Sequence, residues 1–464
     1  MESNADNHDN QKIVMDTFGM ATPRYKQYVD TLAARIRSGE LAAGTQLPTH
    51  RAFAAQEGIS LVTASRVYQE LINQGLVSGE TGRGTFVRDI SLLPVTGIEC
   101  DVTPAMYDLN FIYPEITEQT ALLRRTLRRL SMSGDLESLL HYLPHAGRHQ
   151  EKVVVADHLK LRGFSAVDPD TVVMVSGAQH GLASVVLSMF SPGDVIATDA
   201  LTYPGFKALA QTCHIELIPV PVTPEGPDLA ALAQLCRQRK IRGYFTMPTL
   251  HNPLGWVMDL TSRRKLISLA RENRFFLIED GSYAFLQKPA PAPLAELAPD
   301  ITFYVTGFSK NIATGLRVGL VVAPPGYVAE LEKIIRITTW NTPALMTGIV
   351  REWLEQGEVE KLERKKRRDA KARQKIVSRI FADLPHIAHP AGYFLWIPLP
   401  ENVRCDAVIS RLRAANIVVS PAESYAVTRD IPQAIRVAVS TLPYDDLGSA
   451  LMTVRDTILY LMDL

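Results

Sequence analysis

Hydrophobic residues near the start of the chain recur with helical spacing and then change to a pattern typical of strands. One apolar face predicts a helix that ends at Ser38-Gly39, formed by Tyr25, Tyr28, Val29, Leu32 and Ile36. Thr49 can cap a second, short helix over 52–57, which Gly58 closes. Ser60 can cap a third helix whose apolar side carries Val67, Leu71 and Ile72. Residues 76–77 and 85–87 flank a Gly-rich turn and predict a β-hairpin. We expect these three helices and the hairpin to form one module, which covers residues 12–90.

Short apolar runs alternate with helix-length segments along most of the remaining chain. The runs cover 171–175, 195–198, 215–220, 244–246, 276–278, 303–306 and 318–323. Such alternation is typical of a mostly parallel sheet covered by helices, so we expect an α/β domain over 116–464, with a smaller C-terminal subdomain from about residue 345. Residues 91–115 contain four prolines or glycines without a clear period, which predicts a linker that becomes the entry arm of this domain. The polar residues 1–11 predict a disordered tail.

Composition limits the classes of protein that the chain can represent. A length of 464 residues predicts two or three domains, and the formal net charge of zero gives no argument for nucleic acid or membrane. The four cysteines are scattered without a CxxC pair, so we expect neither a disulfide framework nor a metal site. No apolar run approaches the ~20 residues of a membrane helix. We therefore expect a cytoplasmic protein.

The first module carries residues suited to contacts with DNA. Three helices and a hairpin make a winged helix-turn-helix, whose third helix enters the major groove. The third helix begins with hydroxyl and basic residues, namely Ser60, Thr63, Ser65 and Arg66. Arg51 begins the second helix, and the wing tip carries Thr81, Gly82 and Arg83. The alternative is a protein-docking domain, because nine Lys/Arg against seven Asp/Glu between Lys12 and Asp89 give only +2.

Three segments of this module resemble the GntR-type DNA-binding domain. They are LPTHR at 47–51, GISLVTASRVYQELINQGLV at 58–77 and GETGRGTFV at 79–87. The resemblance implies binding to a double-stranded DNA operator through the arginine, hydroxyl and wing positions named above. The chain departs from it at Leu61 and Val62, where some relatives carry polar or basic residues.

Polar residues follow the predicted strands at their carboxyl ends, where open α/β sheets bind ligands. Ser176-Gly177-Ala178-Gln179 opens a helix whose free N–H groups favour a phosphate. Tyr203 can stack on a flat ring, Asn252 and Tyr283 can donate to a phenolate oxygen, and Asp280 needs a cationic partner if it is buried. Lys310 follows the apolar run 301–305 and can form an imine, while Ser309 and Arg317 can hold phosphate. Each of these residues alone also has an ordinary structural explanation.

The whole series resembles the fold-type I pyridoxal-phosphate aminotransferases, from near Thr120 to the C-terminus. The resemblance implies that Lys310 binds pyridoxal 5′-phosphate covalently, that Asp280 pairs with the pyridine nitrogen, and that Tyr203 stacks on the ring. Asn252 and Tyr283 would hold the 3′-oxygen, and Arg436 would bind a substrate carboxylate. The implied phosphate ligands are Gly177, Ala178, Gln179, Ser309 and Arg317, with Tyr142 from the partner subunit of a homodimer. Relatives usually carry a hydroxyl residue where this chain has Gly307.

The union of both domains resembles the MocR branch of GntR regulators. This implies a transcription regulator that senses an amine or amino acid. The alternative is an active aminotransferase, moving an amino group from an amino acid to a 2-oxo acid, with a fused DNA-binding module. Lys361–Lys375 holds nine Lys/Arg against two acids. We interpret this run mainly as a solvated helix face, with contact to DNA or to the helix-turn-helix as the alternative.

Overall fold

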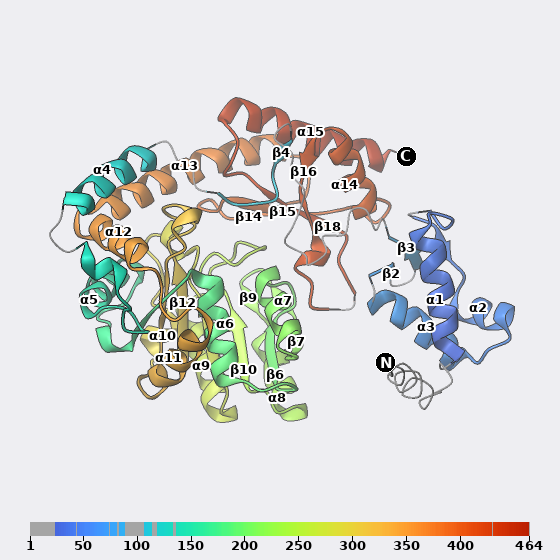
Figure 1. The fold of residues 1–464 in the computed structure, drawn as a ribbon. Coiled ribbons are helices and arrows are strands. Elements are labelled where there is room, and N and C mark those ends of the chain that lie inside the picture. Colours follow the sequence, from blue (N-terminus) through green and yellow to red (C-terminus); the bar gives the residue numbers. More distant parts are fainter. Residues whose placement is uncertain are drawn as a thin grey trace, which may run out of the picture. The chain divides into compact units, whose positions relative to one another are not determined.

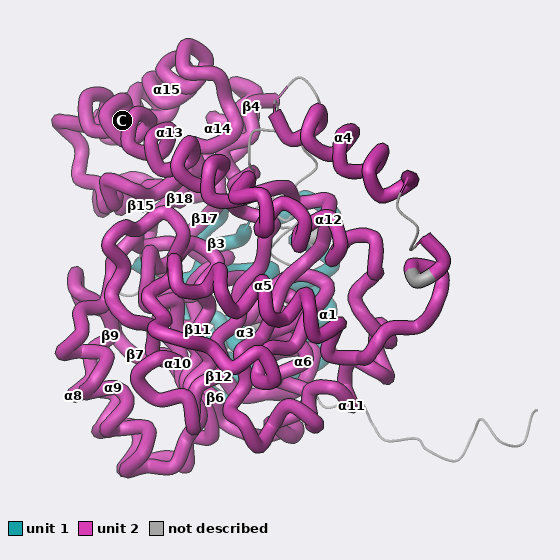
Figure 2. The backbone as a smooth tube through the Cα atoms, turned by 90° about the vertical axis from the view of Figure 1, so that its left-hand side faces the viewer, with its two compact units in different colours: residues 1–93 teal, residues 94–464 magenta. Residues whose placement is uncertain are grey.

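The computed structural model describes residues 24–42, 44–73, 75–80, 83–88, 106–113, 118–132, 136–428 and 430–463. The chain forms two compact units, 1–93 and 94–464, which Figure 2 colours separately. The division falls inside the linker predicted over 91–115. The predicted disordered tail and most of the predicted linker lie outside the described residues.

Unit 1 contains the three expected helices and the expected hairpin. Its elements are α1 (Arg24–Arg37), β1 (Gln46–Leu47), α2 (His50–Glu57), α3 (Leu61–Asn73), β2 (Val77–Glu80) and β3 (Gly84–Val87). The Thr49 hydroxyl accepts a hydrogen bond from Ala52 N at 3.2 Å, and Gly58 ends α2 in the left-handed region with φ 62°. The Ser60 hydroxyl accepts from Thr63 N at 3.1 Å. The predicted caps are therefore confirmed.

One face of α3 forms the centre of the unit 1 core. Ala64, Val67 and Leu71 are fully buried there, and they pack with residues of α1, α2 and the hairpin. The sequence did not predict β1, which pairs antiparallel with β3 through Gln46 and Leu47. A two-residue strand is too short to show an alternating pattern. The opposite face of α3 is left for solvent.

A seven-stranded sheet forms the large subdomain of unit 2, in the order β5-β13-β12-β11-β10-β6-β7. The strands are β5 (Val172–Val175), β6 (Val195–Asp199), β7 (Glu216–Val220), β10 (Gly243–Thr246), β11 (Phe276–Asp280), β12 (Thr302–Gly307) and β13 (Gly319–Val322). Each predicted apolar run coincides with one of them. All neighbours pair in parallel except β13, which is antiparallel to both β12 and β5. The mostly parallel sheet is confirmed.

Helices cover this sheet, which explains why its strands are apolar on both faces. The helices around it in Figure 1 are α6 (Ala178–Met189), α7 (Pro204–Thr212), α8 (Leu229–Gln238), α9 (Leu260–Asn273), α10 (Leu294–Leu297) and α11 (Val328–Thr338). Side chains of α4 (Gln119–Met132), α5 (His149–His158) and α12 (Ala344–Glu355) share an apolar core with side chains of β5, β12 and β13. A small strand pair is formed by β8 (Val222–Thr223) and β9 (Gly226–Pro227). No described helix is both long and apolar enough to cross a membrane.

The small subdomain contains a four-stranded sheet in the order β14-β15-β18-β17. Its elements are β14 (Ile387–Ala388), β15 (Phe394–Pro398), β17 (Ser420–Pro421), β18 (Ala434–Ala438), α13 (Glu358–Ile380), α14 (Cys405–Ala414) and α15 (Tyr444–Met462). Side chains of α13, α14 and α15 pack with those of β15 and β18 in one apolar core. The arm adds β4 (Tyr107–Asp108), which pairs in parallel with β16 (Ile417–Val418). The arm therefore belongs to this subdomain.

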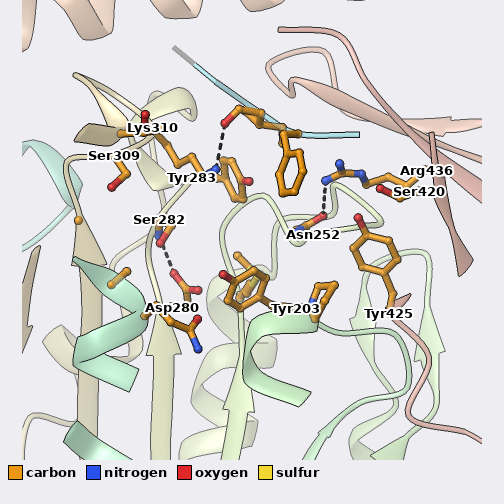
Figure 3. A pocket seen from close by; sticks show the side chains of 18 of the residues that line it. Tyr203, Asn252, Asp280, Ser282, Tyr283, Ser309, Lys310, Ser420, Tyr425 and Arg436 are labelled. Atoms are coloured by element: carbon orange, nitrogen blue, oxygen red, sulfur yellow. Dashed lines mark hydrogen bonds between the residues drawn. The ribbon is translucent and has the colours of Figure 1, made fainter. Parts of the chain in front are cut away.

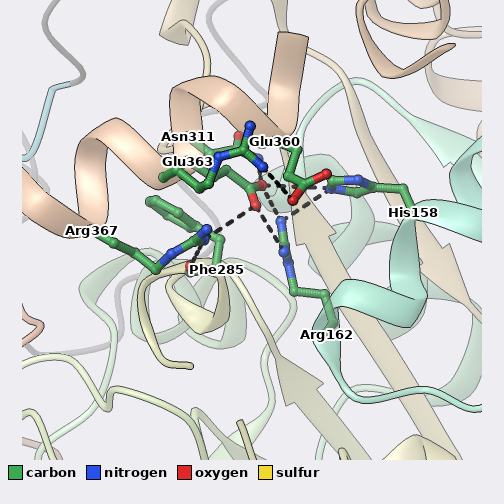
Figure 4. Close-up of polar contacts among 8 residues, drawn as sticks. His158, Arg162, Phe285, Asn311, Glu360, Glu363 and Arg367 are labelled. Atoms are coloured by element: carbon green, nitrogen blue, oxygen red, sulfur yellow. Dashed lines mark hydrogen bonds and ion pairs between the residues drawn. The ribbon is translucent and has the colours of Figure 1, made fainter. Parts of the chain in front are cut away.

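Most of the basic residues in the run Lys361–Lys375 on α13 are exposed, as expected of a solvated helix face. The inner side of the helix is buried instead. Glu363 is fully buried, and Lys366 and Arg373 are also buried. Figure 4 shows Glu363 at the centre of a polar cluster, where it accepts from Arg162 Nη1 at 3.1 Å and from Asn311 Nδ2 at 2.7 Å. Burial alone would raise the pKa of Glu363, but Arg162 and His158 hold it well below the usual range.

The second half of α13 is fixed to the small subdomain instead. Arg373 Nη1 donates to the carbonyl oxygens of Val439 at 2.8 Å and Leu442 at 2.6 Å, and Gln374 Nε2 donates to Gly392 O at 2.8 Å. Only the outer side of α13 carries the expected solvent-exposed pairs, such as Arg364 with Glu360. The helix thus connects the two subdomains through buried polar contacts at both ends.

Candidate functional site

One cavity collects most of the predicted site residues of unit 2 at the carboxyl ends of the large sheet (Figure 3). The predicted residues that line it are Ala178, Gln179, Tyr203, Asn252, Asp280, Tyr283, Ser309, Lys310, Arg317 and Arg436. Arg436 and Tyr425 lie across the cavity from Lys310 and Ser309. The cavity is therefore bounded by both subdomains.

Lys310 follows β12 and points its amine into the cavity. Its Nζ donates to the backbone oxygen of Ile112 at 2.9 Å. Burial lowers the pKa of Lys310 to about 8, with Arg436 and Arg317 adding to the effect and Asp280 opposing it. The lowered pKa increases the fraction of this amine that is neutral near physiological pH, and the neutral amine is the form that attacks a carbonyl carbon.

Asp280 ends β11 and is almost fully buried. Its Oδ1 accepts from Ser282 N at 2.9 Å, and among the described residues it forms no ion pair. Burial raises the pKa of Asp280, partly opposed by Ser282 and Lys310. A carboxylate in this position is stabilised by a cation or an N–H donor that enters the cavity.

Two tyrosines, the partly buried Tyr203 and the buried Tyr283, offer neutral hydroxyl groups to the same cavity. Burial raises the pKa of Tyr203 to about 12, with Asp280 adding to the effect. Burial also raises the pKa of Tyr283, partly opposed by Arg436. Both phenols therefore stay protonated at neutral pH and can donate a hydrogen bond.

Gly177, Ser309 and Arg317 lie close together at the N-terminus of α6, and Ser309 and Arg317 line the cavity. Gly177 precedes that helix with φ 90°, and a Cβ there would lie 2.6 Å from Arg317 Nη2. Arg317 Nη1 donates to the Ser309 hydroxyl at 3.2 Å. Gln179 Nε2 is used within the protein, because it donates to Gly205 O at 2.9 Å. The helix N-terminus and the guanidinium together suit a phosphate.

Arg436 on β18 brings a buried cation to the cavity. Its Nη1 donates to Asn252 Oδ1 at 3.4 Å, and its Nη2 donates to the backbone oxygen of Asn110. Its Nε has no hydrogen-bond partner among the described residues. A guanidinium held in this way can bind a carboxylate in bidentate geometry, donating hydrogen bonds to both of its oxygens.

Sequence reasoning missed the cavity residues that the arm and the small subdomain supply. These are Asn110, Phe111 and Ile112 from the arm, with Ser420 and Tyr425 from the small subdomain. Ile112 acts through its backbone oxygen, which leaves no signature in the side-chain sequence. Tyr142 does not line the cavity; it is 82% exposed and packs against Trp340 with ring centroids 5.2 Å apart. Its role through a partner subunit stays a prediction.

The predicted DNA contacts of unit 1 differ in how they are held. Arg51, Arg66 and Arg83 are exposed, and the Arg66 guanidinium lies 4.1 Å from the centroid of the Tyr25 ring. Ser60 and Thr63 share a hydrogen bond of 2.9 Å between their hydroxyls, whereas the Ser65 hydroxyl pairs with His50 Nδ1 at 3.1 Å. Thr81 and Gly82 lie outside the described residues.

Comparison with known families matches both parts of the chain. Residues 113–453 match the family described as aminotransferase class I and II, and residues 24–87 match the family of bacterial regulatory proteins, gntR family. The chain is 27% identical to the uncharacterized HTH-type transcriptional regulator YdeF of Bacillus subtilis, over 93% of this chain and 94% of that protein. It is 26% identical to the uncharacterized HTH-type transcriptional regulator YjiR of Escherichia coli, over 89% and 94%.

Solved structures share the fold of the larger part. LysN, an α-aminoadipate aminotransferase from Thermus thermophilus, superposes with a TM-score of 0.71 at 23% identity, covering 79% of this chain and 96% of that chain. Kynurenine aminotransferase from Pyrococcus horikoshii gives 0.72 at 20% identity, covering 80% and 98%. At these identities the likeness concerns the fold alone.

The lowered pKa of Lys310 predicts a distinctive pH profile for its chemical reactivity. The rate at which acetic anhydride acetylates Lys310, followed on its peptide by mass spectrometry, should rise with pH through a midpoint of about 8. The protein is first freed of small molecules, and added Nα-acetyl-lysine, with an ordinary side-chain pKa of about 10.4, is the reference.

Two variants should move that midpoint in opposite directions. Arg436→Gln removes a cation that disfavours the ammonium form, so the midpoint should rise. Asp280→Asn removes an anion that favours the ammonium form, so the midpoint should fall. A parent midpoint equal to that of the reference, or shifts of equal sign in both variants, would contradict the electrostatics described for this cavity.

Proposed function

Because the chain belongs to the aminotransferase class I and II family, we propose that its cavity binds pyridoxal 5′-phosphate and serves a DNA-binding transcription regulator that senses an amino acid or amine. The observation that carries this proposal is the presence in one cavity of Lys310, a half-buried lysine with a lowered pKa, and Asp280, a buried carboxyl without an ion pair among the described residues. The first suits an aldehyde and the second suits a protonated ring nitrogen. One cofactor satisfies both.

The residues around the cavity fit the remaining parts of that cofactor. Tyr203 would stack on the ring, and Asn252 and Tyr283 would donate to the 3′-oxygen. The first turn of α6, through Gly177, Ala178 and Gln179, would hold the phosphate together with Ser309, Arg317 and the partner subunit's Tyr142. Bound there, the cofactor supplies an aldehyde that exchanges amines and withdraws electrons from them.

The space around Gly307 gives a physical reason for a glycine at this position, where relatives usually carry a hydroxyl residue. A Cβ at Gly307 would lie 3.2 Å from Ala178 N and 3.3 Å from Val318 O. A side chain would therefore crowd the N-terminus of α6, where the phosphate is proposed to bind. Arg317 and Ser309 remain as the side-chain ligands from this loop.

An amino acid effector would contact both sides of the cavity. Its amino group would lie at Lys310, and its carboxylate would pair with Arg436 on β18. Lys310 would be able to take up or give a proton at its Nζ, since burial lowers its pKa to about 8. The effector would thereby connect the large and the small subdomain.

The N-terminal domain would read a double-stranded operator with α3 in the major groove. Ser60, Thr63, Ser65 and Arg66 lie on or next to the first turns of α3, Arg51 lies on α2, and the wing would add Thr81, Gly82 and Arg83. A homodimer would place two such domains on two half-sites. This function places the protein in the cytoplasm, with the DNA.

A second candidate is a working aminotransferase that carries the same DNA-binding domain. A 2-aminoadipate transaminase of Thermus thermophilus, 25% identical over 72% of this chain and 85% of its own length, favours it. The two regulators reported above cover about nine tenths of this chain, both domains included, and this favours the regulator. Single-turnover mixing with a panel of amino acids separates the two, because only transamination yields free 2-oxo acid and pyridoxamine phosphate.

The cofactor assignment predicts one modified residue. Borohydride reduction of the yellow purified protein, followed by peptide mass mapping, should place the label on Lys310, and Lys310→Ala should carry none. Lys207→Ala is a matched control, since burial also lowers the pKa of that lysine to about 8 but it lies outside the cavity lining. A label on any lysine other than Lys310 would refute the assignment.

The DNA assignment predicts how salt affects binding. Arg51→Ala should weaken operator binding, and the slope of log affinity against log salt should become shallower by about 1 if the guanidinium contacts a phosphate. Arg274→Ala is a control on a basic, exposed residue of unit 2. Equal affinity and slope for parent and Arg51→Ala would contradict the predicted contact, and the cofactor absorbance should not change in either variant.

A further inference from the structure

The first turn of α3 presents two large apolar side chains to solvent. Val62 is 79% exposed and Leu61 is 46% exposed. The core face of the same helix is formed by Ala64, Val67 and Leu71, which are fully buried. Val62 therefore contributes little to the folding of unit 1, and its apolar surface remains in contact with water.

Polar and cationic groups surround this apolar pair, Leu61 and Val62. The hydroxyls of Ser60 and Thr63 hydrogen-bond to each other at 2.9 Å beside it. Arg66 follows Val62 by one helical turn, so the two side chains share one face of α3. Arg66 is held on that face by Tyr25, whose hydroxyl it contacts at 3.3 Å and whose ring lies 4.1 Å from its guanidinium carbon. A cationic, hydroxyl-rich rim fits nucleic acid.

We propose that Val62, with Leu61 beside it, contacts the C5-methyl group of a thymine and makes the operator thymine-specific at that position. The inference rests on the proposed function, in which α3 enters the major groove. Thymine is the base that carries a methyl group in that groove, and apolar side chains are its direct readers. Valine suits this task because its β-branched side chain has little rotamer freedom to lose. The hydroxyls and Arg66 remain for neighbouring polar groups of the DNA.

The test removes the methyl group from the DNA instead of the side chain. An operator is first selected from a randomised duplex library with the full-length protein, and each thymine is then replaced singly by deoxyuridine. Parent protein should lose about fourfold in affinity at the contacted thymine, which corresponds to one apolar carbon returned to water. Val62→Ala, which removes both γ-methyl groups, should bind the parent operator more weakly and show a smaller loss with deoxyuridine there than the parent protein.

Arg66→Ala is the matched variant on the same face. It should weaken binding but keep the parent's loss at the deoxyuridine position, because it leaves Val62 in place. Thermal unfolding of Val62→Ala should match that of the parent, which separates a lost contact from a misfolded domain.

Two outcomes would overturn the proposal. The first is a flat deoxyuridine scan with parent protein that binds its operator, and the second is an unchanged loss in Val62→Ala and in Leu61→Ala. If the scan is flat and Val62→Ala also alters the oligomeric state, the pair is a protein–protein contact instead. Failure of the parent to bind any selected duplex would refute the proposed DNA-binding function itself, and this inference with it.

Discussion

Two ionisable groups in one cavity, the half-buried Lys310 and the buried Asp280, set the main constraint on this molecule. Taking charged groups out of water is unfavourable. The pKa of Lys310 is lowered and that of Asp280 is raised, and Asp280 has no ion pair among the described residues. The surrounding fold keeps this arrangement rigid, because β11 and β12 lie side by side in the centre of a covered sheet. A ligand that offers Asp280 a cation and Lys310 a carbonyl group offsets the unfavourable burial of both groups. The burial that destabilises the empty cavity therefore favours binding of such a ligand.

The cavity is also a junction between two subdomains, and α13 contacts both of them through buried polar groups. Asn311, next to Lys310, donates to Glu363 in the first half of α13, while Arg373 in the second half holds backbone oxygens of the small subdomain. The wall opposite Lys310 carries Arg436 from the small subdomain. A ligand that contacts both walls changes the balance between conformations by its differential affinity for them, which is the only way a ligand can shift an equilibrium. An amino acid, with an amine at one end and a carboxylate at the other, has this property.

Much of the fold could be predicted because its signals are local. Apolar runs identified the strands of the large sheet. Polar residues that follow these strands, such as Asp280 and Asn252, could be placed at the carboxyl edge of the sheet from the sequence pattern alone. The missed features depend on contacts between residues far apart in sequence. Ile112 contributes a backbone oxygen, which no residue type reveals, and Glu363 is buried because Arg162, 201 residues away, reaches it. Without that partner, the charge run of α13 is typical of a surface helix.

The central claim is that capture of an amino acid between Lys310 and Arg436 changes the affinity of the N-terminal domain for DNA. The most direct measurement is operator affinity, with and without a saturating amount of the common amino acid that most changes the cofactor absorbance of the parent, for parent and Arg436→Ala. The account predicts a change of at least about fivefold in the parent, and in the variant an unaltered cofactor spectrum, an unaltered affinity without amino acid and no response to it. A variant that responds with the parent's full coupling free energy at saturation would contradict the account, because the signal would then bypass Arg436.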